Sequence, residues 1–275
     1  MEFLLSKNMN DALQKYQLKS PVISNQTGVI CEENNALIGC LYYTDNHFHP
    51  YSIYLHFKFF IKNPEVDILN RMFSILKSEI PNSNYILNLE DNYNSIKKFI
   101  HNNGFKEIRK TYEPDVHIDN LLRHYHYIDS YPKSKHPPFV ITNELVHKVQ
   151  DIYRKIHVAN PLGGVSLPEW KKIITNGLDL ENSIVIYNEN IEITAYLFIF
   201  HGSESTKEIG WVYYKNEDAK RQLLNQFKTS LSHLQKVGIK TICLEVDNTD
   251  KYAYELFFPF LIHGEPSSIT YIKYK

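Results

Sequence analysis

The spacing of apolar residues changes along the segment from Asn88 to Tyr112, "NLEDNYNSIKKFIHNNGFKEIRKTY". An apolar strand end and an Asn-rich turn come first, and apolar residues three and four apart then predict an amphipathic helix. Gly104 follows the helix and predicts a C-cap, because glycine adopts positive φ without steric cost. Phe105 predicts the start of a strand that packs into the core.

The same pattern returns near the C-terminus in "ICLEVDNTDKYAYELFFPFLI". Placing Val246 on Leu89 gives an offset of 246 − 89 = 157 residues. Upstream, two hairpins, two strands and two long helices repeat at a similar spacing. The matched ranges are 28–43 with 183–200, 51–61 with 207–214, and 64–80 with 218–238. A period this long predicts two related domains rather than a solenoid.

A polar segment separates the two copies. Residues 123–137 are rich in Pro, Ser, Lys and His and lack helical periodicity, which predicts a linker. The predicted domains are therefore residues 1–122 and residues 138–275. Two helices are expected after the linker, one capped by Thr142 or Asn143 and one with Pro168 in its first turn.

The element order of the repeat is helices, hairpin, strand, long helix, strand, helix and closing strand. The segments "EIGWVYY", "LQKVGIKTICLEVDN" and "NSIKKFIHNNGFKEI" carry a specific likeness. With them the chain resembles the GNAT N-acetyltransferase superfamily, twice in tandem and over nearly its whole length. The resemblance implies an α/β (α+β) fold with two tandem GNAT-like domains, each a mixed, mostly antiparallel twisted sheet flanked by helices.

Acetyl-CoA is the co-substrate that this resemblance implies. In such a fold a splayed fourth strand accepts the pantetheine arm, and the next helix offers free N–H groups and a positive dipole to the pyrophosphate. In the C-terminal copy the implied cofactor-binding residues are Trp211, Val212, Tyr213, Lys220, Arg221, Gln222 and Asn248.

The phosphate loop departs from the family pattern R/Q-x-x-G-x-G/A. Gln222 and Leu224 stand where glycines are expected. The N-terminal copy has no glycine there, and it puts Glu65 and Asp67 in the first helical turn, where carboxylates repel a pyrophosphate. The C-terminal copy is therefore the expected acyl-CoA site, with a solvated helix face as the alternative for its basic residues.

N-acyl transfer needs a base for the acceptor ammonium and an acid for the leaving thiolate. By resemblance Glu208 stands at a base position on the fourth strand, and an exposed strand-end carboxylate is the alternative. Ile100 and Phe257 occupy the place of the family's acidic Tyr. Tyr254, nearly one helical turn away, is the expected acid, with a core-edge Tyr as the alternative.

The acceptor groove is expected at "IHVANPLGGVSLPEW". Asn160-Pro161 and Gly163-Gly164 predict a mobile turn, and Trp170 is a candidate wall of the groove. An ordinary helix–helix connection is the alternative.

Composition narrows the remaining choices. The chain is 43% hydrophobic and 22% charged with a formal net charge of −1, so neither disorder nor nucleic-acid binding is expected. The three cysteines lack CxxC spacing, and the "HFHP" and "HYH" histidines have no third ligand, so no metal is expected. Without a signal peptide or membrane span, a cytoplasmic protein is expected.

The leading hypothesis is an acyl-CoA-dependent N-acyltransferase that acts on an amine of a small molecule or peptide. A homodimer is compatible with the sequence. The alternative is a non-catalytic GNAT pseudoenzyme used for acyl-CoA sensing or protein interaction. A third interpretation, an aminoacyl-tRNA-dependent transferase, needs a basic surface that the balanced charge argues against.

Overall fold

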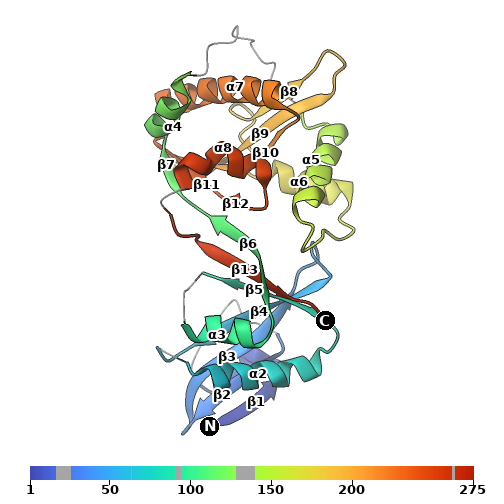
Figure 1. Cartoon of the computed structure of the whole chain (residues 1–275), viewed down its shortest axis with the longest axis vertical. Helices are drawn as coiled ribbons and strands as arrows, with labels where there is room; N and C mark the ends of the chain where they lie inside the picture. Colours follow the sequence, from blue (N-terminus) through green and yellow to red (C-terminus); the bar gives the residue numbers. More distant parts are fainter. Residues whose placement is uncertain (17–25, 63, 91–93, 128–139, 262–263) are drawn as a thin grey trace. The chain divides into compact units, whose positions relative to one another are not determined.

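The computed structural model describes residues 1–16, 26–62, 64–90, 94–127, 140–261 and 264–275. These residues form two compact units (Figure 1). Unit 1 comprises Met1–Arg109, Ala159–Gly163 and Ser268–Lys275, and unit 2 comprises Lys110–Val158 and Gly164–Ser267.

The sheet of unit 1 has the strand order β1-β2-β3-β4-β5-β13-β6. The pairs β1–β2, β2–β3, β3–β4 and β5–β13 are antiparallel, whereas β4 and β5 run parallel. The strands are β1 (Glu2–Ser6), β2 (Gly28–Glu33), β3 (Ala36–Asp45), β4 (Ser52–Phe59), β5 (Asn84–Leu89), β6 (Lys106–Tyr112) and β13 (Ser268–Lys273). Strand β6 crosses into unit 2 after Arg109.

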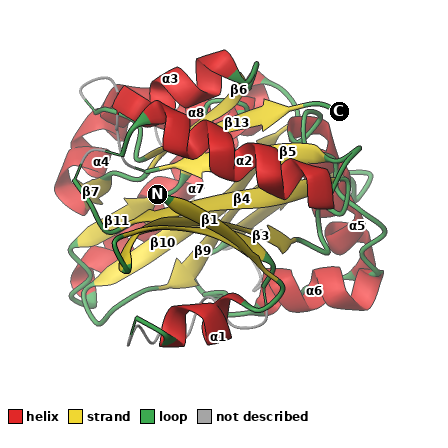
Figure 2. Ribbon diagram, turned by 90° about the horizontal axis from the view of Figure 1, so that it is seen from below, coloured by secondary structure: helices red, strands yellow, loops and turns green. Residues whose placement is uncertain are grey.

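Helices cover both faces of this sheet (Figure 2). Helix α1 (Met9–Gln14) lies on one face, and α2 (Val66–Glu79) and α3 (Asn94–Asn102) lie on the other. Helix α2 buries Leu69, Phe73 and Leu76 at helical spacing, which fixes the face it turns to the sheet. The predicted C-cap after α3 is confirmed, because Gly104 has φ +68°.

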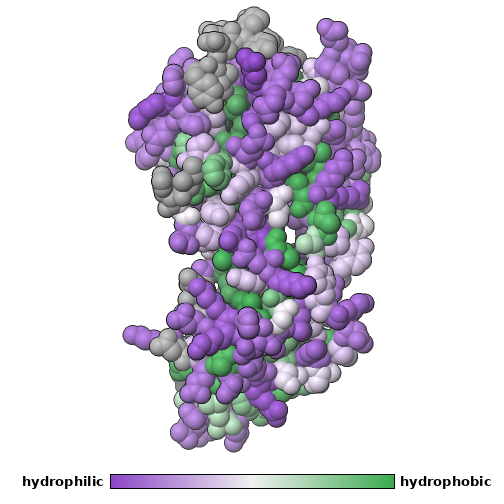
Figure 3. Space-filling model, in the orientation of Figure 1, coloured by the Kyte–Doolittle hydropathy of each residue, from purple (hydrophilic) through white to green (hydrophobic). Residues whose placement is uncertain are grey.

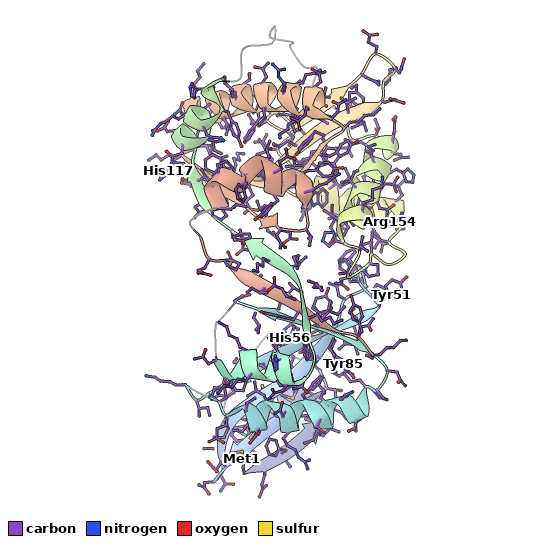
Figure 4. The ribbon with its side chains drawn as sticks, viewed as in Figure 1. Met1, Tyr51, His56, Tyr85, His117 and Arg154 are labelled. Atoms are coloured by element: carbon purple, nitrogen blue, oxygen red, sulfur yellow. The ribbon has the colours of Figure 1, made fainter. Side chains whose placement is uncertain are left out.

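The sheet of unit 2 has the strand order β7-β11-β10-β9-β8. Its strands are β7 (Asp115–His117), β8 (Ile184–Tyr187), β9 (Ile193–His201), β10 (Thr206–Tyr214) and β11 (Thr241–Leu244), and the short β12 (Val246–Asp247) pairs with the end of β6. Only β10 and β11 run parallel among the described pairs of this sheet. His117 at the end of β7 is labelled in Figure 4.

Two sets of helices enclose this second sheet. Helices α4 (Ile118–His124), α7 (Glu217–Lys236) and α8 (Lys251–Leu261) share one core with inward residues of β9 such as Ala195 and Leu197. Tyr196 alternates with these residues and so faces the opposite side, where α5 (Asn143–Ile156) and α6 (Leu167–Thr175) pack. Both predicted helix starts are confirmed: Thr142 caps α5, and Ser166 closes a capping box in front of α6.

Each unit takes in a strand from the far part of the chain. Strand β13 pairs with β5 in unit 1, and β7 pairs with β11 in unit 2. The compact units therefore differ from the expected ranges 1–122 and 138–275. Residues 110–122, with β7, belong to unit 2, and residues 159–163 and 268–275, with β13, belong to unit 1. Within the expected linker, residues 123–127 instead end α4 and form the 3-10 turn η1 (Tyr125–Tyr127). Residues 128–137 lie outside the described residues.

The parallel pairs reproduce the predicted offset. Ser52 to Leu55 of β4 stand opposite Asn84 to Leu87 of β5, and Thr206 to Ile209 of β10 stand opposite Thr241 to Leu244 of β11. The second strands differ by 241 − 84 = 157 residues, which equals the offset expected from the sequence.

Candidate functional site

Strand β10 contains a bulge where it parts from β11. Ile209 pairs with Ile199 of β9 and Val212 pairs with Leu197, so Gly210 and Trp211 together oppose a single residue. A Cβ on Gly210 would lie 2.6 Å from the Phe200 ring, which explains the glycine. Beyond Ile209 no described strand pairs with β10 on the β11 side, so its backbone edge is open there.

An open cleft of about 290 Å³ lies on one side of this bulge. Four exposed carboxylates line it together with the Phe200 ring and Gly210. The carboxylates are Glu113, Asp115, Glu208 and Glu245. Their charges make the cleft attractive to a cation such as an ammonium group. The predicted base Glu208 therefore lies in a cavity of this unit.

Cys243 also lines the cleft but is a poor nucleophile. Burial is the main cause that raises the pKa of its thiol, to about 11, and the hydrogen bond to Asp115 and the charges of Asp115 and Glu208 add to it. Near neutral pH the thiol is therefore protonated, and a thiol of this kind does not attack a thioester readily.

A smaller cavity of about 10 Å³, close to the size of one water, lies where β10 continues past the bulge. It is lined by apolar residues of α5, by Tyr196, Trp211 and Val212, and by Asp250. The Trp211 ring stacks on Trp170 at 5.8 Å between centroids. Trp170 is only 2% exposed, so it supports Trp211 from behind and does not form an open groove wall.

The N-terminus of α7 is already engaged by the chain's own polar groups. The Asn216 side chain accepts from the Ala219 N–H at 2.9 Å, and Glu217 and Asp218 occupy the first turn. A pyrophosphate at this helix end would meet these two carboxylates, so the helix end fits it less well than the open edge of β10 fits the pantetheine amides.

The three predicted phosphate-binding residues differ in their surroundings. Lys220 forms ion pairs with Glu255 and Glu217, and Gln222 donates to Asp218 at 2.8 Å. Arg221 is exposed, and no ion pair or hydrogen bond holds it within the described part of the chain. Arg221 is thus the residue of the three best able to meet a phosphate.

Two other predicted residues do not reach either cavity. Asn248 accepts from the Lys110 N–H at 2.8 Å, so its side chain extends the β6–β12 pairing. Tyr254 packs beside Tyr112 and Phe258 on the edge of the core. The structure therefore does not bring Asn248 or Tyr254 together with Glu208.

Asp250 is the cavity residue that the sequence analysis missed. It is 9% exposed and caps α8, with Oδ1 accepting from the N–H groups of Tyr252 at 3.0 Å and Ala253 at 3.2 Å. Burial raises its pKa to about 6. The available signal was an Asp three residues before Ala253, the spacing of a helix N-cap.

Unit 1 has a tyrosine at the position that corresponds to Glu208. Tyr54 pairs with Ile86 as Glu208 pairs with Cys243, so Tyr54 is the counterpart of Glu208. Its hydroxyl accepts from Asn160 Nδ2 at 2.7 Å. Pro161 O lies 3.2 Å from His49 Nδ1, so the loop 159–163 lies against this part of unit 1. The labelled His56 and Tyr85 lie on β4 and β5 of the same unit (Figure 4).

Neither a metal centre nor a membrane segment emerges from the described residues. They contain no group of three or more His, Cys, Asp or Glu side chains able to hold a metal ion. None of the helices they form is long and apolar enough to cross a bilayer. Mostly hydrophilic side chains cover the face seen in Figure 3, in keeping with 30 basic and 31 acidic residues.

Each unit contains a parallel strand pair joined by a long helix, β4–α2–β5 in unit 1 and β10–α7–β11 in unit 2, and in unit 2 the pair splays at a bulge. Two such units in tandem are a GNAT-like fold. This confirms the predicted fold class. No family model and no curated protein matches the sequence. The likeness is to solved structures, at identities that establish the fold alone.

A GCN5-related N-acetyltransferase from Sphaerobacter thermophilus aligns with a TM-score of 0.60 and 10% identity, over 96% of this chain and 84% of that chain. A tandem GNAT protein from the clavulanic acid biosynthesis pathway aligns with a TM-score of 0.52 and 8% identity, over 99% and 98%. A probable N-acyltransferase from Enterococcus faecalis aligns with a TM-score of 0.50 and 10% identity, over 99% and 72%.

Proposed function

We propose that the chain is an acyl-CoA-dependent N-acyltransferase, with acetyl-CoA as co-substrate and an amine of a small molecule or peptide as acceptor. The observation that carries this proposal is the bulged, splayed β10 with a carboxylate-lined cleft beside it. Unit 2 is the active unit in this proposal, and unit 1 is a structural partner. The cytoplasmic location and the homodimer stay predictions.

The residues of unit 2 divide the work between binding and proton transfer. The acidic cleft attracts the acceptor ammonium, and Glu208 takes its proton so that a neutral amine can attack. Bound acyl-CoA supplies the activated acyl thioester. The open edge of β10 at Trp211, Val212 and Tyr213 receives the pantetheine amides, and Arg221 meets the pyrophosphate. The protonated Cys243 favours direct transfer over an acylated cysteine.

A thermal titration with acetyl-CoA tests the proposal. A ligand that binds only the native state raises the unfolding midpoint, by about 2.7 kcal/mol of stability at 100 times its Kd. Both tryptophans, Trp170 and Trp211, belong to unit 2, so the transition seen by tryptophan fluorescence should move. Adenosine 3′,5′-bisphosphate is a control for the nucleotide half alone. An unchanged midpoint at millimolar acetyl-CoA would contradict the proposal.

A non-catalytic acyl-CoA sensor is the second candidate, favoured by the engaged helix end at Asn216 and Lys220. The two candidates separate when a panel of amines is offered with acetyl-CoA. An acyltransferase releases free CoA in proportion to one or more amines, whereas a sensor binds acetyl-CoA and releases none.

A further inference from the structure

A second carboxylate borders the splay of β10, away from the acceptor cleft. Asp250 lines the small cavity together with Trp211 and Val212, the residues that follow Gly210. Glu208 and Gly210 line the open cleft. The bulge therefore has a carboxylate in the cavity on either side of it, one exposed and one 91% buried, since Asp250 is 9% exposed.

One oxygen of Asp250 is available for chemistry. Its Oδ1 accepts both capping N–H groups, and among the described residues none donates to Oδ2. Oδ2 is not one of the fully buried side-chain atoms that lack a partner, so it keeps a small exposed surface that water can reach. The cavity beside it has about 10 Å³, room for one water that Oδ2 can bind.

The charges around Asp250 do not neutralise it. Among the described residues no ion pair includes Asp250; Lys251 follows it directly in the chain, and the charge of Asp247 raises its pKa. Lys148 on α5 and Lys251 on α8 lie over the rings of Tyr213 and Tyr252. Tyr196 and Tyr214 lie close enough for the charge of Asp250 to contribute to the raised pKa of each phenol. Burial is the largest cause of the raised pKa of Asp250 and the charge of Asp247 adds to it, whereas the two capping N–H groups lower it.

We propose that Asp250 is the general acid that protonates the leaving thiolate, through the one water of the small cavity. The inference rests on the proposed function. The neutral amine forms the C–N bond, the C–S bond breaks, and its electron pair stays on sulfur. A proton from Asp250 reaches the sulfur through the water and gives the free thiol. The proton that the new amide nitrogen loses returns through water to the Asp250 carboxylate, so the step is balanced.

The variant Asp250→Asn tests this role because Asn caps a helix as well as Asp does and has nearly the same shape. With acetyl-CoA, turnover should fall about 10²-fold, a size usual for a lost general acid, while acetyl-CoA affinity stays near the wild-type value. Asp250→Ser, which also caps, should repeat the result if the Asn variant folds poorly.

Changing the leaving group of the thioester shows whether Asp250 acts as a general acid or only as a helix cap. The acetyl thioester of a thiophenol releases a more acidic thiol that needs no proton, so the variant and the wild type should then react at similar rates. Equal slowing with both thioesters, or wild-type turnover with acetyl-CoA, would overturn the inference.

An exposed carboxylate on α5 gives the matched control. Asp151 lines neither cavity, so Asp151→Asn should leave the ratio of the two rates unchanged. A chain that neither binds acetyl-CoA nor acylates any amine would sink the proposed function and this inference together. Full turnover in Asp250→Asn would sink the inference alone.

Discussion

The strand pairs β4–β5 and β10–β11 share one register but differ by one inserted residue. The ladder between β3 and β4 runs from Gly39 opposite Phe59 to Asp45 opposite Ile53 without a shift. The ladder between β9 and β10 shifts between Ile209 and Val212. A bulge re-aims the side chains and backbone groups on either side of it. The comparison teaches that one fold can keep its sheet in both units while only unit 2 has the bulge that opens a strand edge beside a cleft.

The side chains around the two parallel strand pairs also differ between the units. Glu208 faces an open cleft, whereas its counterpart Tyr54 is bound to Asn160 of the loop 159–163. Helix α7 begins with a side-chain cap from Asn216, whereas α2 begins at Glu65 without one. Unit 1 thus uses this part of the fold to hold its own chain.

Buried charges in the exchanged strands should give the largest effect. Ile272 on β13 is 0% exposed in unit 1, and Val116 on β7 is 6% exposed in unit 2. Ile272→Asp should destabilise unit 1, and Val116→Asp should destabilise unit 2, each by more than about 4 kcal/mol, because an unpaired charge is buried. Hydrogen exchange of the β5 and β11 amides reports the two units separately.

The outcome decides which unit each strand completes. If β11 lost its protection in Ile272→Asp while β5 kept it, each closing strand would serve its own half of the chain, and the exchange would be wrong.

Loss of the base should give the next largest effect. Glu208→Gln keeps the shape but removes the proton acceptor, so turnover should fall about 10²–10⁴-fold with little change in acetyl-CoA affinity. Its pH–rate profile should lose the acidic limb. The counterpart variant Tyr54→Phe should leave turnover unchanged. Equal losses in both variants would mean that the effect passes through stability and not through a base.

A charge reversal at α7 should weaken acetyl-CoA binding by a smaller amount. Arg221→Glu should cost about 1.5–3 kcal/mol of binding free energy if Arg221 meets a phosphate. Arg71→Glu on α2 makes the same change of net charge in unit 1 and should have no such effect. Calorimetric titration gives both affinities. The same affinity in the two variants would remove Arg221 from the site.

The pH dependence of unit 2 should give the smallest effect. Asp250 has its pKa raised from 3.8 to about 6, so between these values the folded protein keeps a proton that the unfolded chain has lost. Its contribution to stability therefore falls as pH rises from about 4 to 6 and stays low above that. Asp250→Asn should therefore be more stable than the wild type at pH 8 and similar to it at pH 4.

Tryptophan fluorescence during urea unfolding measures this difference, because Trp170 and Trp211 both belong to unit 2. A constant difference between the two proteins from pH 4 to 8 would show that Asp250 does not titrate in this range.

Local patterns predicted most elements, because hydrophobic period and capping are set within a few residues. The C-cap at Gly104 and the cap at Thr142 follow from such patterns. The exchange of β7 and β13 could not be predicted, because a repeated sequence offers each closing strand two equivalent sheet edges. Which of the two sheet edges a strand joins depends on the path of the whole chain, and no local sequence pattern determines that path.

The candidate site was predictable in part for similar reasons. Glu208 was predicted from the family resemblance of its strand and stays a proposal, whereas Gly210 inside a strand was an unused signal for the bulge. Asn248 was predicted from the resemblance, and Asp250 was not predicted; the structure shows that α8 begins at Lys251 and that Asp250 is its cap. The cavity beside Asp250 is lined by residues of α5 and β9, far away along the chain, and no local pattern predicts that packing.

The pairing of β5 with β13 also delays completion of the unit 1 sheet during synthesis. Ile269 pairs with Leu89, so 269 − 89 = 180 residues must be made after β5 before its partner exists. At about 5–20 residues per second, the edge of β5 waits roughly 10–40 s on the ribosome. During that time the edge can pair with other strands, including those of neighbouring nascent chains. Slow codons or a bound chaperone in this interval should therefore change the yield of folded protein more than its final stability.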